Sequence, residues 1–187
     1  MTLKKYSLLA YICGFMIVLH IINMITGYSL NHFGIKPRAL VYLPSIFSSP
    51  FLHGSIGHLV NNLSAFIVLS ALCILRSRSF YINSSLFIVV VGGLFVWLFA
   101  RHAIHIGASG WLFGLWSLHI ALAVFERKWL NIIIAALVVI FYGGMIWGIL
   151  PQSRYISFEA HLGGAIAGVL WAFIVVSHNT KKDKYNG

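Results

Sequence analysis

The sequence predicts an all-α membrane protein built from six membrane-spanning helices. Of its 187 residues 60% are hydrophobic and only 9% are charged, far below the roughly 25% charged residues of soluble domains. The mean hydropathy is +0.91. Stretches of about 20 apolar residues, the length that crosses a bilayer, occur six times. We expect the spans at about residues 7–25, 57–75, 80–100, 107–124, 129–150 and 158–177.

These spans and the loops between them occupy nearly the whole sequence. We therefore expect one membrane domain over residues 1–187, with a short tail at 178–187 and no room for a soluble domain. The first span is longer than the apolar core of a signal peptide and lacks a small-residue cleavage site. We expect it to remain in the protein as a membrane anchor.

The first loop, at about residues 26–56, is long and unusually apolar. Its proline and serine content argues against a seventh full span. Two arrangements agree with the residues: a hairpin partly embedded in the outer leaflet, or a loop that lies against the helix ends.

The basic residues predict the orientation. The chain carries 13 Lys and Arg against 3 Asp and Glu, and they fall in short blocks between spans rather than along one face, which argues against nucleic-acid binding. Nine lie on one side of the six spans and four on the other, so the positive-inside rule predicts that both termini are cytoplasmic. The nine are Lys4, Lys5, Arg76, Arg78, Arg127, Lys128, Lys181, Lys182 and Lys184; the four are Lys36, Arg38, Arg101 and Arg154.

Four polar residues stand out in the three spans that begin at the outer side. His58 and Asn62 are one turn apart in the second span, Ser109 opens the fourth, and His161 opens the sixth. Polar side chains are costly within a bilayer and are mostly functional there. We expect His58, Ser109 and His161 about four to six residues inside their spans, which is about 6–9 Å below the outer surface.

Small residues follow both reactive side chains. Gly110 and Gly114 follow Ser109, and the sixth span carries Ala160, Gly164 and Gly168 beside His161. Small-x-x-x-small spacing lets membrane helices approach closely. Packing of the fourth span on the sixth would bring the serine hydroxyl towards the imidazole.

A serine, a histidine and two hydrogen-bond donors can carry out acyl transfer. The serine hydroxyl needs a base, and the developing oxyanion needs donors. The three acids are Glu126, Asp183 and Glu159. Glu126 is expected in a loop, Asp183 in the tail, and Glu159 on a different helix face from the histidine, so a Ser–His dyad is predicted. With a single Asp and no His followed by Glu, aspartyl and H-E-x-x-H zinc chemistry are excluded.

These motifs resemble those of the rhomboid intramembrane serine proteases, from about Gly34 to Trp171. The matching segments are His53-x4-His58-x3-Asn62, Gly107-Ala108-Ser109-Gly110 and Ala160-His161-x2-Gly164-x3-Gly168. The resemblance implies that Ser109 is the nucleophile and His161 its general base, and that His58, Asn62 and the Ser109 backbone N–H form the oxyanion hole. The supporting residues are Gly107, Gly110, Phe113, Gly164 and Gly168.

The resemblance also implies a partly embedded first loop and transmembrane proteins as substrates, and we expect no cofactor or metal. With no organelle transit peptide and a minimal core, we expect a bacterial cytoplasmic membrane, and the predicted orientation opens the active site to the extracytoplasmic side. The alternative is a catalytically inactive rhomboid-like protein that binds membrane proteins. Such relatives usually lack the serine or the histidine, and this chain has both. A small transporter would show inverted repeats and broken spans at the midplane, which are not visible here.

The chain departs from the family pattern at two places. Phe113 replaces a tyrosine that packs against the catalytic histidine in many rhomboids, so ring stacking is expected without a phenolic hydrogen bond. A Trp-Arg pair of the first loop is replaced by Pro44-Ser45, and Arg38 is a candidate substitute as the anchor of that loop.

Several further residues receive structural roles. His53 would lie about 140° around a helix from His58 and is expected to be structural. The pair His102 and His105 lacks acidic or cysteine partners for a metal. His119 is expected to form one interhelical hydrogen bond. The expected interfacial anchors are Trp111, Trp129, Trp147 and Tyr155.

Overall fold

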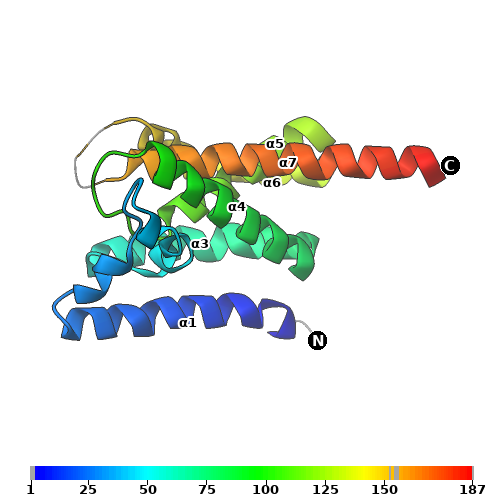
Figure 1. Ribbon diagram of the computed structural model, residues 1–187. Helices are drawn as coiled ribbons and strands as arrows, with labels where there is room; N and C mark the ends of the chain where they lie inside the picture. Colours follow the sequence, from blue (N-terminus) through cyan, green and yellow to red (C-terminus); the bar gives the residue numbers. More distant parts are fainter. Residues whose placement is uncertain (1–2, 152, 154–155, 187) are drawn as a thin grey trace.

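The structure is a computed structural model that describes residues 3–151, 153 and 156–186. Six helices in this part of the chain are long and apolar enough to cross a membrane, which confirms the predicted six-span, all-α fold. They run side by side, and α1 begins at the same end of the bundle at which α7 finishes (Figure 1). The long helices are α1 (Leu3–Ile25), α3 (Ile56–Arg76), α4 (Arg78–Phe99), α5 (Ser109–Glu126), α6 (Trp129–Tyr142) and α7 (Phe158–Asn186).

Two predicted boundaries differ from the structure. The fifth span is α-helical only to Tyr142 and continues as the 3-10 helix η4 (Gly143–Ile149), which begins at a pair of glycines. The sixth helix extends to Asn186, where we expected a tail from residue 178. Hydropathy located the apolar part of α7, which ends at His178; helical structure continues past it because a helix forms its own backbone hydrogen bonds.

Helix α5 lies at the centre of the bundle and packs closely against α7. A Cβ atom at Gly164 would overlap the carbonyl oxygen of Gly110, and one at Gly168 would overlap that of Gly114. The two backbones therefore touch along both glycine stripes, as the small-residue spacing predicts. This crossing places the start of α5 beside the start of α7.

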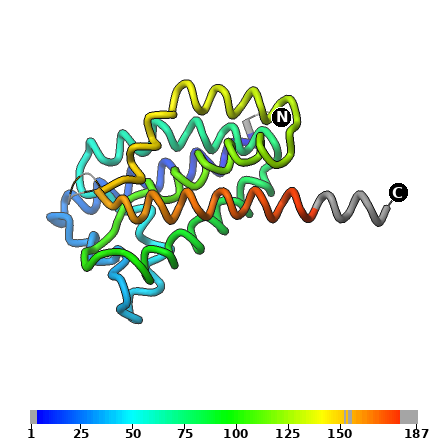
Figure 2. The backbone as a smooth tube through the Cα atoms, turned by 90° about the horizontal axis from the view of Figure 1, so that it is seen from above, coloured from blue at the N-terminus to red at the C-terminus, as the bar shows by residue number. Residues whose placement is uncertain are grey.

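The first loop packs against the side of α4, and in Figure 2 the blue-to-cyan segment projects laterally from the bundle. Ile46 is 4% exposed, and a Cβ at Gly93 of α4 would lie 2.6 Å from its side chain. This part of the loop therefore packs along the side of α4, and another part contacts the end of the same helix. The short helices of the loop are η1 (Ser29–Phe33), η2 (Leu40–Tyr42), α2 (Ser45–Ser48) and η3 (Ser49–Phe51).

Arg38 anchors this loop to the end of α4. Its guanidinium Nη1 donates to the carbonyl oxygens of Leu98 at 3.1 Å and Ala100 at 2.9 Å, and the Trp97 indole donates to Ala39 O at 3.1 Å. The last carbonyls of a helix lack partners within the helix and attract positive charge. Arg38 thus caps α4 and holds the loop, in agreement with the role considered for it from the sequence.

Candidate active site

A cavity of about 840 Å³ lies at the end of the bundle opposite the start of α1. Three helices begin beside it, α3, α5 and α7, and each contributes polar residues that the sequence predicted for the site. The cavity is lined by Gly54, Ser55, His58, Asn61, Asn62, Ala65, Arg101, Ala103, Ile104, His105, Ile106, Ser109, Leu112, Phe113, Tyr142, Met145, Ile156, Ser157 and His161.

Ser109 is the first residue of α5 and is half-buried. It follows Gly107, which has a φ of 114° and donates its N–H to Ser49 O at 2.9 Å. A side chain at Gly107 would be strained by this φ, and its Cβ would lie 2.6 Å from His58 Nε2. Helix α5 thus begins two residues after residue 107, where the fourth span was expected to begin.

His161 lies in the first turn of α7 and is 9% exposed. Its Nδ1 is 2.8 Å from the carbonyl oxygen of Gly148 in η4. A carbonyl oxygen only accepts, so Nδ1 carries the hydrogen and Nε2 of the neutral ring is the basic nitrogen. The Phe113 ring stacks on this imidazole, with centroids 4.1 Å apart and planes at 4°, as expected for this departure from the family pattern.

Ser109 and His161 line the same cavity. Among the hydrogen bonds of the described residues, none joins the Ser109 hydroxyl to the His161 ring. Catalytic hydrogen bonds are often long before a substrate binds and tighten in the complex. Ser109 and His161 thus face the same cavity in the structure, but no hydrogen bond between them is formed among the described residues.

The side chains of His58 and Asn62 both lie close to Gly107, two residues before Ser109. A Cβ atom at Gly107 would lie 2.6 Å from His58 Nε2 and 3.5 Å from Asn62 Nδ2. Ser55 caps α3 by accepting the His58 N–H at 3.1 Å, which fixes where this first turn begins. Asn62 is 7% exposed, and its Nδ2 is buried without a hydrogen-bond partner in the described structure. A buried donor without a hydrogen-bond partner costs about 1–3 kcal/mol of folding stability.

His53 contacts the site in a way that the sequence did not predict. It precedes α3, so the angle of 140° around a helix does not apply to it. The fully buried ring lies edge-on to His58 at 5.0 Å, faces Phe51 O at 3.3 Å through Nδ1, and accepts the Ala108 N–H at 3.5 Å through Nε2. Burial lowers the pKa of His53 to about 4, so the neutral ring is present at neutral pH.

Glu159 is occupied elsewhere and does not contact His161 through any hydrogen bond of the described residues. Its Oε1 lies 3.5 Å from Arg101 Nε and accepts the Arg101 backbone N–H at 3.4 Å. His105 bonds Ser157 Oγ at 2.7 Å and Arg101 O at 3.0 Å, and burial lowers its pKa. The ion pair joins the loop after α4 to the start of α7, consistent with a Ser–His dyad that has no carboxylate member.

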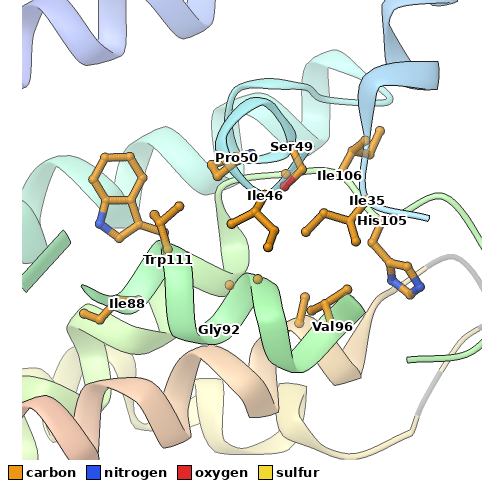
Figure 3. Close-up of a pocket in the computed structure, with 15 residues that line it drawn as sticks. Ile35, Ile46, Ser49, Pro50, Ile88, Gly92, Val96, His105, Ile106 and Trp111 are labelled. Carbon is orange, nitrogen blue, oxygen red and sulfur yellow. The ribbon is translucent and has the colours of Figure 1, made fainter. Parts of the chain in front are cut away.

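A second cavity, of about 40 Å³, lies behind the start of α5. Figure 3 shows it between Ile46 of the first loop and Gly92 and Val96 of α4, with Trp111 at one end and His105 at the other. It has room for a water molecule or two. Neither Ser109 nor His161 lines it, so the larger cavity is the candidate active site.

The remaining structural expectations are partly met. His119 Nε2 bonds the carbonyl oxygen of Leu69 on α3 at 3.0 Å, the single interhelical bond predicted for it. The interfacial role expected for Trp111 is wrong: it is 7% exposed and packs against Phe66 at 4.6 Å, because neighbouring elements bury this part of α5. Trp129 and Trp147 are exposed, and Tyr155 lies outside the described residues.

Among the described residues there is no group of three or more His, Cys, Asp or Glu side chains that could hold a metal ion. His102, one of the two loop histidines considered from the sequence, is exposed, whereas His105 has the partners given above.

Comparison with known proteins identifies the family of this chain. The family model of the rhomboid domain matches residues 42–178. Uncharacterized proteins of Mycobacterium bovis and Mycobacterium tuberculosis are 31% identical to this chain over 173 residues, which is 88% of the chain and 72% of each relative. An uncharacterized protein of Mycobacterium leprae is 31% identical over 182 residues, 91% of the chain and 72% of that relative. This multi-pass membrane protein belongs to the rhomboid family, whose members are generally intramembrane serine proteases.

Proposed function

We propose that the protein is an intramembrane serine endopeptidase with Ser109 as nucleophile and His161 as general base. The observation that carries the proposal is the His161–Gly148 hydrogen bond at 2.8 Å, which leaves Nε2 unprotonated beside the cavity that Ser109 also lines. Without an adjacent base a serine hydroxyl is a weak nucleophile. The backbone carbonyl here does the orienting work that a carboxylate does in a catalytic triad.

In the first step Ser109 Oγ attacks the carbonyl carbon of the scissile peptide and its proton passes to His161 Nε2. The tetrahedral intermediate then collapses, and His161 gives the proton to the leaving amine. This releases one product and leaves an acyl group on Ser109. Water, deprotonated by the same Nε2, hydrolyses the ester and restores the serine hydroxyl.

The oxyanion of each tetrahedral intermediate would be held by His58 Nε2–H, Asn62 Nδ2–H and the backbone N–H of Ser109. The unpartnered, buried Nδ2 of Asn62 supports this assignment, because it is a donor kept free in the resting protein. The Ser109 N–H is one of the first N–H groups of α5, which have no acceptor within the helix. One such donor is worth about 3–4 kcal/mol in soluble hydrolases.

The substrates would be transmembrane helices of other membrane proteins. The excess of basic residues at the end that carries both termini would place that end in the cytoplasm. The cavity would then open to the extracytoplasmic side of the cytoplasmic membrane of a bacterium. The first loop, which packs along α4 at the extracytoplasmic end, would then rest partly in the outer leaflet.

A labelling experiment separates a protease from an inactive family member that only binds membrane proteins. The purified chain is treated with a fluorophosphonate probe, and cleavage of a single-span reporter is followed in parallel. The parent protein should be labelled by the probe and should cleave the reporter. Ser109→Ala should show neither labelling nor cleavage, and His161→Ala should lose at least cleavage. Labelling of Ser109→Ala, or a parent protein that neither labels nor cleaves any reporter of a broad panel, would contradict the proposal.

A further inference from the structure

An apolar groove of about 210 Å³ runs along the opposite wall of α5 from the catalytic cavity. It lies between α1 and α4 and is closed by the end of the first loop, and it shares no lining residue with the catalytic cavity. Its lining residues are Leu8, Ile12, Phe47, Pro50, Phe51, Tyr81, Ile82, Ser85, Leu86, Val89 and Trp111.

The groove opens towards the surroundings of the bundle. Phe47 and Leu86 are each 56% exposed, and Ile82 is 42% exposed. In a six-span membrane protein such faces meet acyl chains, because no water is present there to penalise apolar exposure. A groove between two helices can hold one acyl chain along its length, whereas a flat helix face contacts many acyl chains and holds none of them.

Two unpaired cations stand at one mouth of the groove. Lys4 is four residues before Leu8, and Arg78 is four residues before Ile82, so each cation shares a helix face with a lining residue. Both side chains are exposed, and neither forms a hydrogen bond or ion pair within the part of the chain that the structure describes. Figure 1 shows that α1 and α4 both begin at this end of the bundle.

Three other cations at this end, among the side chains that the structure describes, do have partners. Arg76 and Lys128 both pair with Glu126, at 2.6 and 2.7 Å, and Lys5 Nζ donates to Leu75 O at 3.2 Å. Among the described side chains at this end, Lys4 and Arg78 are therefore exposed cations without a partner, and both lie one helical turn beyond the apolar groove.

We propose that this groove binds an anionic phospholipid of the leaflet on the side of the termini. One acyl chain lies against Leu8, Ile82 and Leu86, and the phosphate lies between Lys4 and Arg78. Basic pockets between membrane helices bind anionic head groups in this way, and apolar burial holds the chain. The site is separate from catalysis and would exist in an inactive protein as well.

The test measures lipid binding to the full chain carrying Ser109→Ala, so that proteolysis plays no part. Native mass spectrometry counts bound phosphatidylglycerol and, separately, phosphatidylcholine. We expect Lys4→Gln and Arg78→Gln each to weaken phosphatidylglycerol binding about fivefold and to leave phosphatidylcholine binding nearly unchanged, since a basic residue near the surface is worth about 1 kcal/mol. Lys128→Gln is the matched control, because it removes a cation at the same end away from the groove.

A second variant tests the groove itself. Leu86→Trp fills it with a larger side chain and should weaken binding of both lipids while leaving the thermal midpoint close to that of the parent. Equal binding of the two lipids by the parent protein, or a loss in Lys128→Gln as large as in Arg78→Gln, would overturn the proposal. So would a dimer that Leu86→Trp dissociates, since a second copy would then cover the groove.

Discussion

His161 donates its Nδ1 hydrogen to the carbonyl oxygen of Gly148, across 2.8 Å from α7 to η4. Position 148 has no space for a side chain: a Cβ there would lie 2.6 Å from Phe113 Cζ and 3.2 Å from His161 Nδ1. The orientation of the proposed base therefore depends on the 3-10 end of the fifth span. Any displacement of η4 would change the hydrogen bonding of the imidazole.

We predict that Gly148→Ala reduces cleavage at least tenfold, through kcat more than KM, because general-base catalysis contributes about 10²–10⁴. Gly144→Ala is the matched control, since a Cβ there meets nothing within 4 Å. The ¹⁵N shifts of the His161 ring should report a protonated Nδ1 in the parent and in Gly144→Ala. Parent-like cleavage by Gly148→Ala would mean that the carbonyl does not position the base.

The oxyanion assignment predicts different effects at two neighbouring asparagines. Asn62→Ala should lower the turnover of a single-span reporter by about 10²–10³-fold, because it removes a donor that acts on the intermediate. Asn61→Ala should have little effect, since Asn61 is exposed although it also lines the cavity. Melting temperatures of the two variants check that both remain folded. Equal losses in the two would assign Asn62 to packing alone.

The glycine and polar patterns located the main parts of this site, but not all of it. Hydropathy predicts the six spans because membrane length and composition are local properties. The crossing of α5 on α7 followed from two glycine pairs, Gly110 and Gly114 on α5 and Gly164 and Gly168 on α7, because small residues four positions apart indicate close backbone contact. Gly148 was missed because a carbonyl oxygen is common to every residue and has no signature in the sequence.

The reason given for a structural His53 was wrong, although the structure does not contradict the role itself. It was placed on a continuous helix with His58, and only the structure shows that α3 begins at Ile56. Its contacts with Phe51, Ala108 and His58 could not be predicted from helix periodicity. Trp111 was misplaced because the sequence gives the composition of a span but not how many neighbours surround it.

The buried His53 predicts a loss of stability in acid. Its pKa is about 4 in the folded protein and 6.5 in an exposed chain, so the unfolded state binds more protons between these values. The contribution of His53 is complete above pH 6.5 and declines as the pH falls towards 4, by an amount of order 2–3 kcal/mol.

His53→Gln should remove that part of the acid sensitivity, because an amide can donate to Phe51 O and accept from Ala108 N–H without titrating. The measurement compares thermal midpoints in detergent at about pH 7.5 and about pH 4.5. His102→Gln, at an exposed position in a loop, is the control and should behave like the parent. An unchanged pH dependence in His53→Gln would contradict the prediction.

The cap that Arg38 places on α4 predicts a modest effect on stability. Arg38→Gln removes the two bonds to Leu98 O and Ala100 O and should cost about 1–2 kcal/mol, since part of this site is exposed. Both residues would sit at the same φ of 59°, so backbone strain does not change. Lys36→Gln in the same loop should cost less, and an equal loss would argue against the cap.

The last prediction concerns where a substrate is cut. Because the cavity lies at the end of the bundle opposite the start of α1, the proposed orientation places the scissile bond near the extracytoplasmic end of a substrate helix. A peptide bond within a helix is shielded by its own hydrogen bonds, so the segment must unwind before Ser109 can attack. Unwinding in lipid is costly because the freed backbone groups have no water. Good substrates should therefore carry Gly, Pro or polar residues in that part of the span.

Cleavage sites are mapped by mass spectrometry in single-span reporters that differ only in the position of a Gly-Pro pair. Moving the pair from the extracytoplasmic end to the cytoplasmic half should abolish cleavage, because the unwound segment no longer reaches the cavity. Replacing the Gly-Pro pair at the extracytoplasmic end with Leu-Leu should also reduce cleavage, because the substrate helix then costs more free energy to unwind. The Ser109→Ala protein is the control for other proteases. Cuts clustered in the cytoplasmic half would contradict the orientation, and indifference to Leu-Leu would contradict the unwinding step.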